Sequence, residues 1–398
     1  MTYSQAKLGS LASFLSGFPF KSNRFNSEGT GMPLVRIRDV TRGTTDTYYD
    51  GEFEDRYIVN RGDYLIGMDG EFNLAQWRSD RALLNQRVCK IDDVSPELDR
   101  HYLARFLPLA LKKIEDATPF ATVKHLSVKT LRDIDIPLPS LDEQRRIAYV
   151  LNQVDELRAR RRAAIALLND LTQSVFLDMF GNVVSNDRQW LSGQVEDLVA
   201  KFTSGKSLAA AEEDGPDVRY RILKVSAVTS GRFDAAESKP APVGYEPPSS
   251  HFVHDGDLVF SRANTEALIG ATALAVQPPR NLLLPDKLWK FVWHADRPSH
   301  PLYVRQLFLQ REFRREVGRR ASGTSGSMKN ISQPKVLSIA CGIPPVELQH
   351  DYGKKVEAVE RLAHRHRVHL EGLDALFDSF QHRAFRDELH MEAVPPAA

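Results

Sequence analysis

The chain has 398 residues, of which 42% are hydrophobic and 26% are charged, and its formal net charge is +1. This length is too great for one compact core, and the composition excludes a disordered or fibrous protein, so we expect at least two folded domains. A net charge near zero excludes a protein that binds polyanions over its whole surface and leaves room only for local basic faces.

Two cysteines, Cys89 and Cys341, lie far apart and have no paired spacing with metal-ligand residues. A disulfide framework and a zinc site are therefore not expected, and both should be small buried apolar residues. The N-terminus is too polar for a secretory signal, and no run approaches the roughly 18 apolar residues that cross a bilayer. We expect a cytoplasmic protein without a membrane segment.

The first predicted domain covers residues 1–138. Short runs rich in valine, isoleucine, leucine and aromatic residues, bounded by glycine, aspartate and proline, are typical of strands and lie at 34–40, 64–68 and 86–91. A helical pattern follows at 97–114. Strands and helices do not alternate as in a doubly wound sheet, so the expected fold class is α+β.

A long helix is predicted next, within the segment 139–182. Pro139 marks its entry, helix-compatible residues run from about Leu141 to Phe180, and Gly181 stops it. Forty residues of helix extend about 60 Å, which is more than the width of an ordinary domain. Such a helix needs a partner to cover its apolar side.

The second half of the chain follows the same order. Residues 183–343 are predicted to form a second α+β domain, with strand-like runs at 220–228, 257–262 and 287–293 and helical patterns at 300–320. The chain therefore carries two modules of one fold class.

A second long helix is predicted within 344–390, from about Val346 to Arg386, and a flexible tail is predicted at 391–398. Gly353 and Gly372 lie inside this helix, each at a cost of about 1 kcal/mol relative to alanine. These two glycines leave open whether the second helix is continuous.

The two long helices are copies of one sequence. "IPLPSLDEQRRIAYVLNQVDEL" at 136–157 returns in altered form as "IPPVELQHDYGKKVEAVERL" at 343–362, so that equivalent residues lie 205 positions apart. Apolar residues recur at intervals of three and four, which predicts a narrow heptad seam formed by Leu151, Val154, Ile165, Leu168, Val175, Val356, Val359, Leu370, Leu373 and Phe380. Two seams of one period can interlock, so we expect an antiparallel coiled coil within the chain.

The repeat extends into the domains. Residues 122–139 align with 327–345, "VTRG" at 40–43 corresponds to "VTSG", and "VNRGDYLI" at 59–66 corresponds to "VHDGDLVF". The offset changes between these segments, which indicates that loops were inserted or lost between shared strands. We interpret the chain as two diverged copies of one unit, a globular module followed by a long helix.

No catalytic motif stands out. "TSGKS" at 203–207 lacks the first glycine of a phosphate-binding loop, and the [DN]-P-P-[FY] string of an amino methyltransferase is absent. There is no nucleophile elbow and no Cys/His nucleophile pairing. His364 and His366 point apart on a helix, so a solvated basic face is favoured over a metal site.

Basic and polar side chains at loop positions are the remaining candidates for a function. Arginine can bond guanine, asparagine can bond adenine and lysine neutralises phosphate, so these residues predict contact with DNA. The candidates are Lys21, Arg24, Arg36, Arg38, Arg42, Arg78, Arg81, Lys124, His125, Lys206, Arg219, Arg232, Arg262, Asn264, Lys287, Lys329 and Asn330.

At this point the sequence resembles the specificity subunits of type I restriction-modification systems. "IPLPSLDEQRRIAYVLNQVDELRARRRAAIALLNDLTQSVFLDMFGN" is similar to the central conserved region of that family, and "GTSGSMKNIS" at 323–332 is similar to the run that closes a target recognition domain. The resemblance covers essentially the whole chain. The second copy lacks the E-Q-x-x-I element found at 143–147.

The resemblance implies a non-catalytic DNA-binding subunit. Two target recognition domains would each read one half of a bipartite, asymmetric DNA target, related by pseudo-twofold symmetry and separated by the coiled coil. Two modification subunits would carry methyl transfer with S-adenosylmethionine, and two restriction subunits would add cleavage with ATP and Mg²⁺. No cofactor is expected in this chain.

The helices would then set the spacing between the half-sites, because each added residue lengthens a helix by about 1.5 Å. Two other interpretations stay open. One is a stand-alone DNA-modifying enzyme whose site is disguised, and the other is a coiled-coil scaffold that binds only protein, which the near-neutral charge favours.

Overall fold

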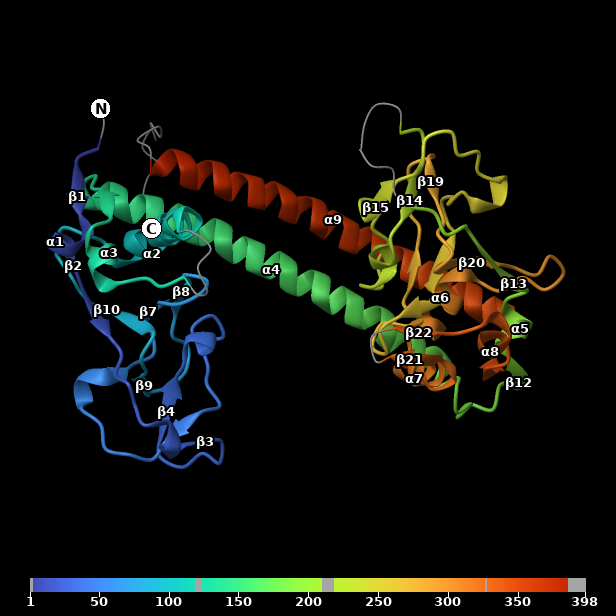
Figure 1. The fold of residues 1–398 in the computed structure, drawn as a ribbon, viewed down its shortest axis with the longest axis horizontal. Coiled ribbons are helices and arrows are strands. Elements are labelled where there is room, and N and C mark those ends of the chain that lie inside the picture. Colours follow the sequence, from blue (N-terminus) through green and yellow to red (C-terminus); the bar gives the residue numbers. More distant parts are fainter. Residues whose placement is uncertain (1–2, 119–123, 210–217, 326–327, 386–398) are drawn as a thin grey trace. The chain divides into compact units, whose positions relative to one another are not determined.

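The computed structural model describes residues 3–118, 124–209, 218–325 and 328–385 (Figure 1). The chain divides into two compact units, one formed by residues 1–162 and 368–398 and the other by residues 163–367. Each unit contains an α+β module and a part of both long helices, so the predicted α+β class with two modules is confirmed. The predicted tail at 391–398 lies outside the described residues.

Both predicted long helices are confirmed. Helix α4 covers Leu141–Phe180, and α9 covers Val346–Ala384 without a break, so the two internal glycines do not interrupt it. Helix α4 ends where Gly181 adopts a φ of +64°, a left-handed conformation that other residues rarely tolerate.

The module of the first unit contains two sheets and a ribbon. The ribbon pairs β1 (Gln5–Lys7) with β11 (Asp135–Pro137). The first sheet is antiparallel, in the order β2 (Ala12–Ser16), β10 (Val88–Val94), β7 (Tyr64–Gly67) and β8 (Leu74–Gln76). The second has the order β3 (Phe25–Asn26), β5 (Tyr48–Tyr49), β4 (Met32–Val35), β9 (Ala82–Leu84) and β6 (Ile58–Val59), and β4 and β9 are parallel. The helices of this module are α1 (Leu8–Leu11), α2 (Arg100–Ala117) and α3 (Val128–Arg132).

The module of the second unit repeats this design. Its ribbon pairs β12 (Leu191–Gln194) with β23 (Ala340–Ile343). An antiparallel sheet has the order β13 (Lys201–Ser204), β20 (Leu288–Val292), β16 (Leu258–Ser261) and β18 (Thr272–Leu274). A three-stranded sheet has the order β15 (Ser238–Pro240), β14 (Arg221–Leu223) and β19 (Leu282–Leu283), with β14 and β19 parallel. A third sheet has the order β17 (Ala263–Asn264), β22 (Met328–Asn330) and β21 (Ser322–Ser325). The helices of this module are α5 (Val195–Leu198), α6 (Pro301–Leu309), α7 (Arg311–Arg320) and α8 (Gln333–Leu337).

Three sequence predictions about these elements need correction. The strand-like run at 34–40 is a strand only to Val35, because residues 37–39 form a 3-10 turn, and the run at 220–228 breaks in the same way at 225. The helical pattern at 300–320 forms two helices, since Gln310 adopts an extended conformation between them. Apolar content identified these segments, but periodicity did not reveal the local turns.

A buried glutamine ties each long helix to the short helix beside it. Gln144 accepts a hydrogen bond from the backbone N–H of Asp99 (2.8 Å), the N-cap of α2, and Gln349 accepts one from His300 (3.1 Å), the N-cap of α6. Each amide nitrogen also donates to the carbonyl of a proline before the long helix. Because both side chains are buried, losing these bonds would leave polar groups without partners. The same contacts in both modules confirm the internal repeat in three dimensions.

Candidate nucleic-acid interface

Three segments of the first module meet beyond the end of β7. The N–H of Met68 donates to the carbonyl of Arg87 (2.9 Å), and the N–H of Leu126 donates to the carbonyl of Met68 (2.7 Å). Asp69 forms an antiparallel bridge with His125. We call residues 68–69, 86–87 and 124–126 the first junction.

The second module contains the same backbone arrangement. The N–H of Arg262 donates to the carbonyl of Lys287 (3.1 Å), and the N–H of Ile331 donates to the carbonyl of Arg262 (3.0 Å). Ala263 pairs with Asn330 in antiparallel register. We call residues 262–264, 286–287 and 329–331 the second junction. The two junctions share a backbone frame but differ in their side chains.

A carboxylate organises the first junction. Asp69 Oδ1 lies 2.5 Å from His125 Nδ1, and Asp69 Oδ2 lies 2.7 Å from Arg87 Nη1. The Asp69 side chain is 11% exposed, whereas those of Arg87 and His125 are 62% and 68% exposed. These residues line a pocket of about 510 Å³ together with Gln86 and Ser16. Two exposed basic side chains are thus held by one half-buried acid.

The second junction contains five of the predicted DNA-binding residues: Arg262, Asn264, Lys287, Lys329 and Asn330. Arg262 Nε donates to the carbonyl of Asp286 (2.7 Å), and Lys329 Nζ lies 3.7 Å from a Glu266 carboxylate oxygen. Asn264 Nδ2 is buried without a hydrogen-bond partner among the described residues. The second junction therefore offers different hydrogen-bonding side chains from the first junction.

Arginines also gather at the 3-10 turn that follows β4. Arg36 donates its N–H to Asp39 Oδ2 (3.0 Å), and Arg38 Nε and Arg42 Nη1 lie 4.0 Å and 3.6 Å from Asp39 Oδ1. Asp39 is 1% exposed, while Arg38 and Arg42 are largely exposed. We call residues 36–42 the basic turn. At the repeat offset of this segment, serines replace two of the arginines in the second module.

The other predicted DNA-binding residues are more dispersed. Arg78 lies against the backbone of Gly43 beside the basic turn, and Lys124 belongs to the first junction. Arg24 ends the 3-10 turn Ser22–Arg24 of the first module. The rest lie in further loops, Lys21 and Arg81 in the first module and Lys206, Arg219 and Arg232 in the second.

Sequence reasoning missed the acidic members of these clusters, and it missed Arg87. The run "QRVCKI" at 86–91 aligns with "DKLWKF" at an offset of 200, which places Arg87 opposite Lys287, itself a predicted residue. That comparison would have found Arg87. Nothing in the one-dimensional pattern would have paired it with Asp69.

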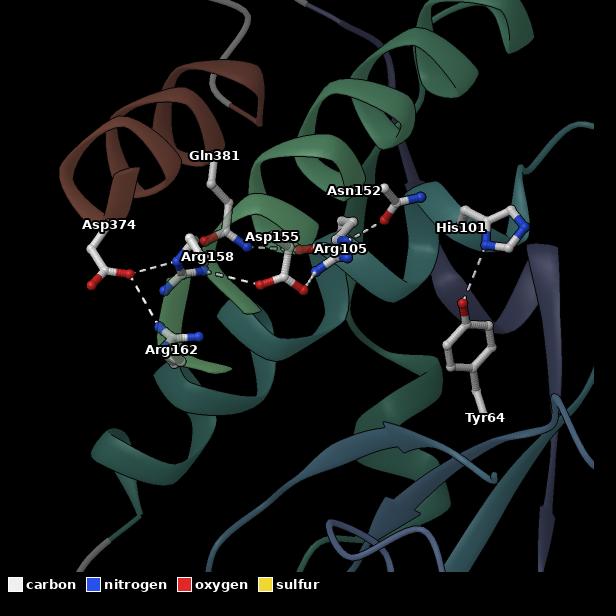
Figure 2. A network of polar contacts seen from close by, with 9 residues as sticks. All are labelled: Tyr64, His101, Arg105, Asn152, Asp155, Arg158, Arg162, Asp374 and Gln381. Carbon is white, nitrogen blue, oxygen red and sulfur yellow. Dashed lines mark hydrogen bonds and ion pairs between the residues drawn. The ribbon is translucent and has the colours of Figure 1, made fainter. Parts of the chain in front are cut away.

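A chain of polar contacts joins α2, α4 and α9 within the first unit (Figure 2). Arg105 of α2 donates to Asp155 of α4 (3.0 Å). Arg158 of α4 donates to Asp155 (3.2 Å) and to Asp374 of α9 (2.5 Å). Arg162 also donates to Asp374 (3.2 Å). These contacts link the module to both long helices.

Apolar packing accompanies these contacts in each unit. The guanidinium of Arg158 lies 4.4 Å from the ring centroid of Phe377, and because Arg162 meets Asp374, α4 and α9 run antiparallel in the first unit. In the second unit Tyr352 of α9 packs against Phe176 of α4, with ring centroids 5.5 Å apart.

The predicted seam residues are buried or half-buried. Leu151, Val154, Leu373 and Phe380 belong to the core of the first unit or pack against it, and Val175 and Val356 do so in the second. The others, Ile165, Leu168, Val359 and Leu370, are half-buried. Sequence reasoning missed the aromatic seam residues Phe176, Tyr352 and Phe377.

Neither cysteine is a reactive site. Cys89 and Cys341 are free and buried, as predicted, and burial raises the pKa of each thiol to about 12. A thiol with that pKa is protonated at neutral pH and is a poor nucleophile. Among the described residues, no group of three His, Cys, Asp or Glu side chains could hold a metal ion.

Comparison with known proteins gives a consistent result. A family model described as the type I restriction modification DNA specificity domain matches residues 2–167. The type I restriction enzyme EcoBI specificity subunit of Escherichia coli is 41% identical over 194 residues, which are 48% of this chain and 41% of that protein. The EcoKI specificity subunit of Escherichia coli strain K12 is 26% identical over 390 residues, which are 90% of this chain and 82% of that protein.

One solved structure has a similar fold along most of the chain. The S subunit of a type I restriction-modification system from M. genitalium matches with a TM-score of 0.58 and 15% identity, over 96% of each chain. At that identity the likeness concerns the fold alone. Within the described residues, no helix has both the length and the apolar character needed to cross a membrane.

Proposed function

We propose that this chain is a specificity subunit of a type I restriction-modification system and that each of its two modules reads one part of a bipartite DNA sequence. The junctions and the basic turn would contact the duplex. The modules carry different side chains at equivalent backbone positions, so the target would be asymmetric.

The observation that carries this proposal is the repeated junction. Its backbone hydrogen bonds are the same in both modules, whereas Asp69, Arg87 and His125 are replaced by Ala263, Lys287 and Asn330. A fixed scaffold with variable side chains suits a protein that reads different sequences with one fold. Arginine, histidine and asparagine also provide the directional hydrogen bonds that base edges require.

The chain itself would not catalyse a reaction. In the proposed complex, two modification subunits supply methyl transfer with S-adenosylmethionine, and two restriction subunits supply ATP-dependent cleavage with Mg²⁺. The complex would act on cytoplasmic DNA. The long helices would form the surface on which these partners assemble, because several large apolar side chains stay exposed along α4, including Tyr149, Leu167 and Leu171.

Mapping the methylated sites tests this proposal. The full chain is co-produced with its modification subunit in cells that lack other DNA methylation, and the modified positions are read by sequencing. We expect one motif made of two different half-sites with a fixed spacer. Modification without a motif, or a motif with a single part, would contradict the proposal.

Two further measurements separate the other interpretations. Purified chain incubated with methyl donor, Mg²⁺ and ATP should give no turnover, whereas a stand-alone enzyme would act under these conditions. Binding to duplex DNA in the presence of the modification subunit should weaken steeply as salt rises, because phosphate contacts release counterions. A scaffold that binds only protein would show no such binding.

A further inference from the structure

We propose that Arg87, held in place by Asp69 beside His125, reads a G·C base pair in the half-site of the first module. The inference rests on the proposed function, since it assigns one base contact within that interface. It is drawn from the backbone, the charges and the donor geometry of the first junction.

The backbone of Arg87 is in a conformation that normally favours glycine. Its φ is +69°, in the turn between β9 and β10, where the N–H of Val88 bonds back to the carbonyl of Asn85 (3.2 Å). A residue with a Cβ is strained in this region, and such strain tends to persist at sites that bind ligands. A glycine would satisfy the turn more easily, so the arginine side chain has a reason to be there beyond the turn.

The charges at this site suit a base edge better than a phosphate. Asp69 carries a negative charge within 2.7 Å of the Arg87 guanidinium, so the pair is close to neutral as a unit. A phosphate at this position would be attracted by the arginine but repelled by the aspartate. A guanine edge is uncharged and offers two acceptors, O6 and N7, so it needs directed donors instead of net charge.

The donors of Arg87 are directed in this way. One nitrogen, Nη1, faces Asp69, and the side chain is 62% exposed, so the rest of the planar guanidinium faces solvent. A carboxylate behind a guanidinium fixes the plane of the group and reduces the entropy lost when the group binds. The remaining N–H groups can then bond O6 and N7 of guanine together.

His125 complements this contact. Its Nδ1 faces Asp69 Oδ1 at 2.5 Å, so in the neutral ring the proton sits on Nδ1 and Nε2 is an acceptor. The acceptor lies on the far side of the ring from Asp69, and the side chain is 68% exposed. Cytosine presents an N4 donor in the major groove, next to the guanine acceptors of the same base pair. Arg87 and His125 together therefore match the G·C pattern.

The basic turn, in contrast to the Arg87–Asp69 pair, carries more positive than negative charge. Arg38 and Arg42 pair with Asp39, Arg36 bonds Asp39 through its backbone N–H, and Arg42 also pairs with Asp46, so three arginines against two aspartates leave a net positive charge. That charge suits phosphate contacts, which position a protein on the duplex without reading sequence. Base reading and phosphate binding would thus be divided between neighbouring parts of one module, since Ile37 of the turn lies against Gly67 at the end of β7.

Selection from a pool of duplex DNA with randomised positions tests the inference. The full chain, together with the modification subunit, is used as the bait, and Arg87→Gly is compared with the natural sequence. Glycine relieves the strained φ, which offsets the loss of the ion pair with Asp69, and the Asp69 carboxylate keeps His125 as a partner, so this variant should fold like the natural chain. We expect it to lose discrimination at one G·C position by about tenfold or more, with the other half-site unchanged.

Arg87→Lys is the second variant. It keeps the charge but cannot donate to O6 and N7 in one plane, so it should lose the same preference.

The dependence of binding on salt should stay the same in Arg87→Gly, whereas loss of a phosphate contact would lower the slope by about one. Arg61→Gly is the matched control, because Arg61 also pairs with an aspartate in this module, Asp80 (3.2 Å), and is 68% exposed. The Arg61→Gly variant should select the same DNA motif as the natural chain.

Two outcomes would overturn the inference. One is an unchanged motif in Arg87→Gly, and the other is a uniform loss of affinity with a reduced salt slope, which would make Arg87 a phosphate contact. Either result would leave the proposed function standing, provided that the natural chain selects a bipartite motif. If the natural chain selects no motif, the proposed function itself fails.

Discussion

The two glycines inside α9 have opposite surroundings. A Cβ added to Gly353 would lie 2.2 Å from Cε1 of His300, whereas a Cβ on Gly372 would meet nothing within 4 Å. The His300 ring cannot move away freely, because its Nδ1 accepts the hydrogen bond that caps α6, from the N–H of Leu302 (3.3 Å). Burial, with His350 nearby, lowers the pKa of His300 and keeps the ring a neutral acceptor. Gly353 is thus required by close packing, and Gly372 is not.

We predict opposite effects of alanine at these two positions. Gly353→Ala should lower the free energy of unfolding by about 1–3 kcal/mol, because the new methyl group displaces the cap of α6. Gly372→Ala should raise it by about 0.5–1 kcal/mol, because alanine is the better helix former and meets no obstacle. Urea unfolding of the two variants measures both changes, and a shift of the same sign in both would contradict this account.

The contact of Arg158 with Asp374 sets how α4 meets α9 in the first unit. Arg158 bonds the carboxylates of Asp155 and Asp374 (Figure 2). It is also only 16% exposed and covers the ring of Phe377, so its position is fixed by several partners. Asp374 receives two arginines of α4 one helical turn apart. A shift of α9 by one turn would break both contacts at once.

Removing this carboxylate should destabilise the first unit. Asp374→Ala should lower the free energy of unfolding by about 1–3 kcal/mol, because the half-buried Arg158 keeps only Asp155 and loses its other carboxylate partner. A double-mutant cycle with Arg158→Ala should give a coupling energy of at least about 1 kcal/mol. The control cycle uses Arg160 and Glu156, an exposed pair on the same helix, whose coupling should stay below about 0.5 kcal/mol. Equal coupling in the two cycles would refute a special role for Asp374.

The sequence predicted the long helices well because their signals are local. Pro139, the heptad period and Gly181 lie within one stretch of chain, and they placed α4 to the residue. The aromatic seam partner Phe377 was missed, since its burial depends on side chains of α2 and α4 that lie far away in sequence. The pairing of Asp69 with Arg87 and His125 was missed for the same reason, because the three residues come from three separate segments.

The connection between the two units consists of helices that both of them share. Residues 163–166 of α4 and 368–371 of α9 lie at the boundary between the units and are equivalent in the repeat. Deleting both segments removes about 6 Å and slightly more than one turn from each helix, so the apolar faces stay nearly aligned. If the helices set the spacing, the spacer in the methylated motif should shorten by about two base pairs, at about 3.4 Å each, with both half-sites intact.

The control for these deletions keeps the helix length and truncates the two seam side chains that lie in the deleted segments. Ile165→Ala with Leu370→Ala should reduce stability and leave the spacer unchanged. A spacer that stays the same after the deletions, in a complex that still methylates DNA, would reject the helices as the element that sets the distance.

The boundaries of the units have a consequence for how the chain folds as it is made. The first unit includes residues 368–384 of α9, and its core contains Phe377 and Ala384 from that segment. These residues leave the ribosome only after all of 163–367, a delay of about 10–40 s at about 5–20 residues per second. During that interval the N-terminal module has an incomplete core with an uncovered apolar face. The part of the protein that is synthesised first is therefore among the last to finish folding, and a ribosome that stops early leaves it open to chaperones and proteases.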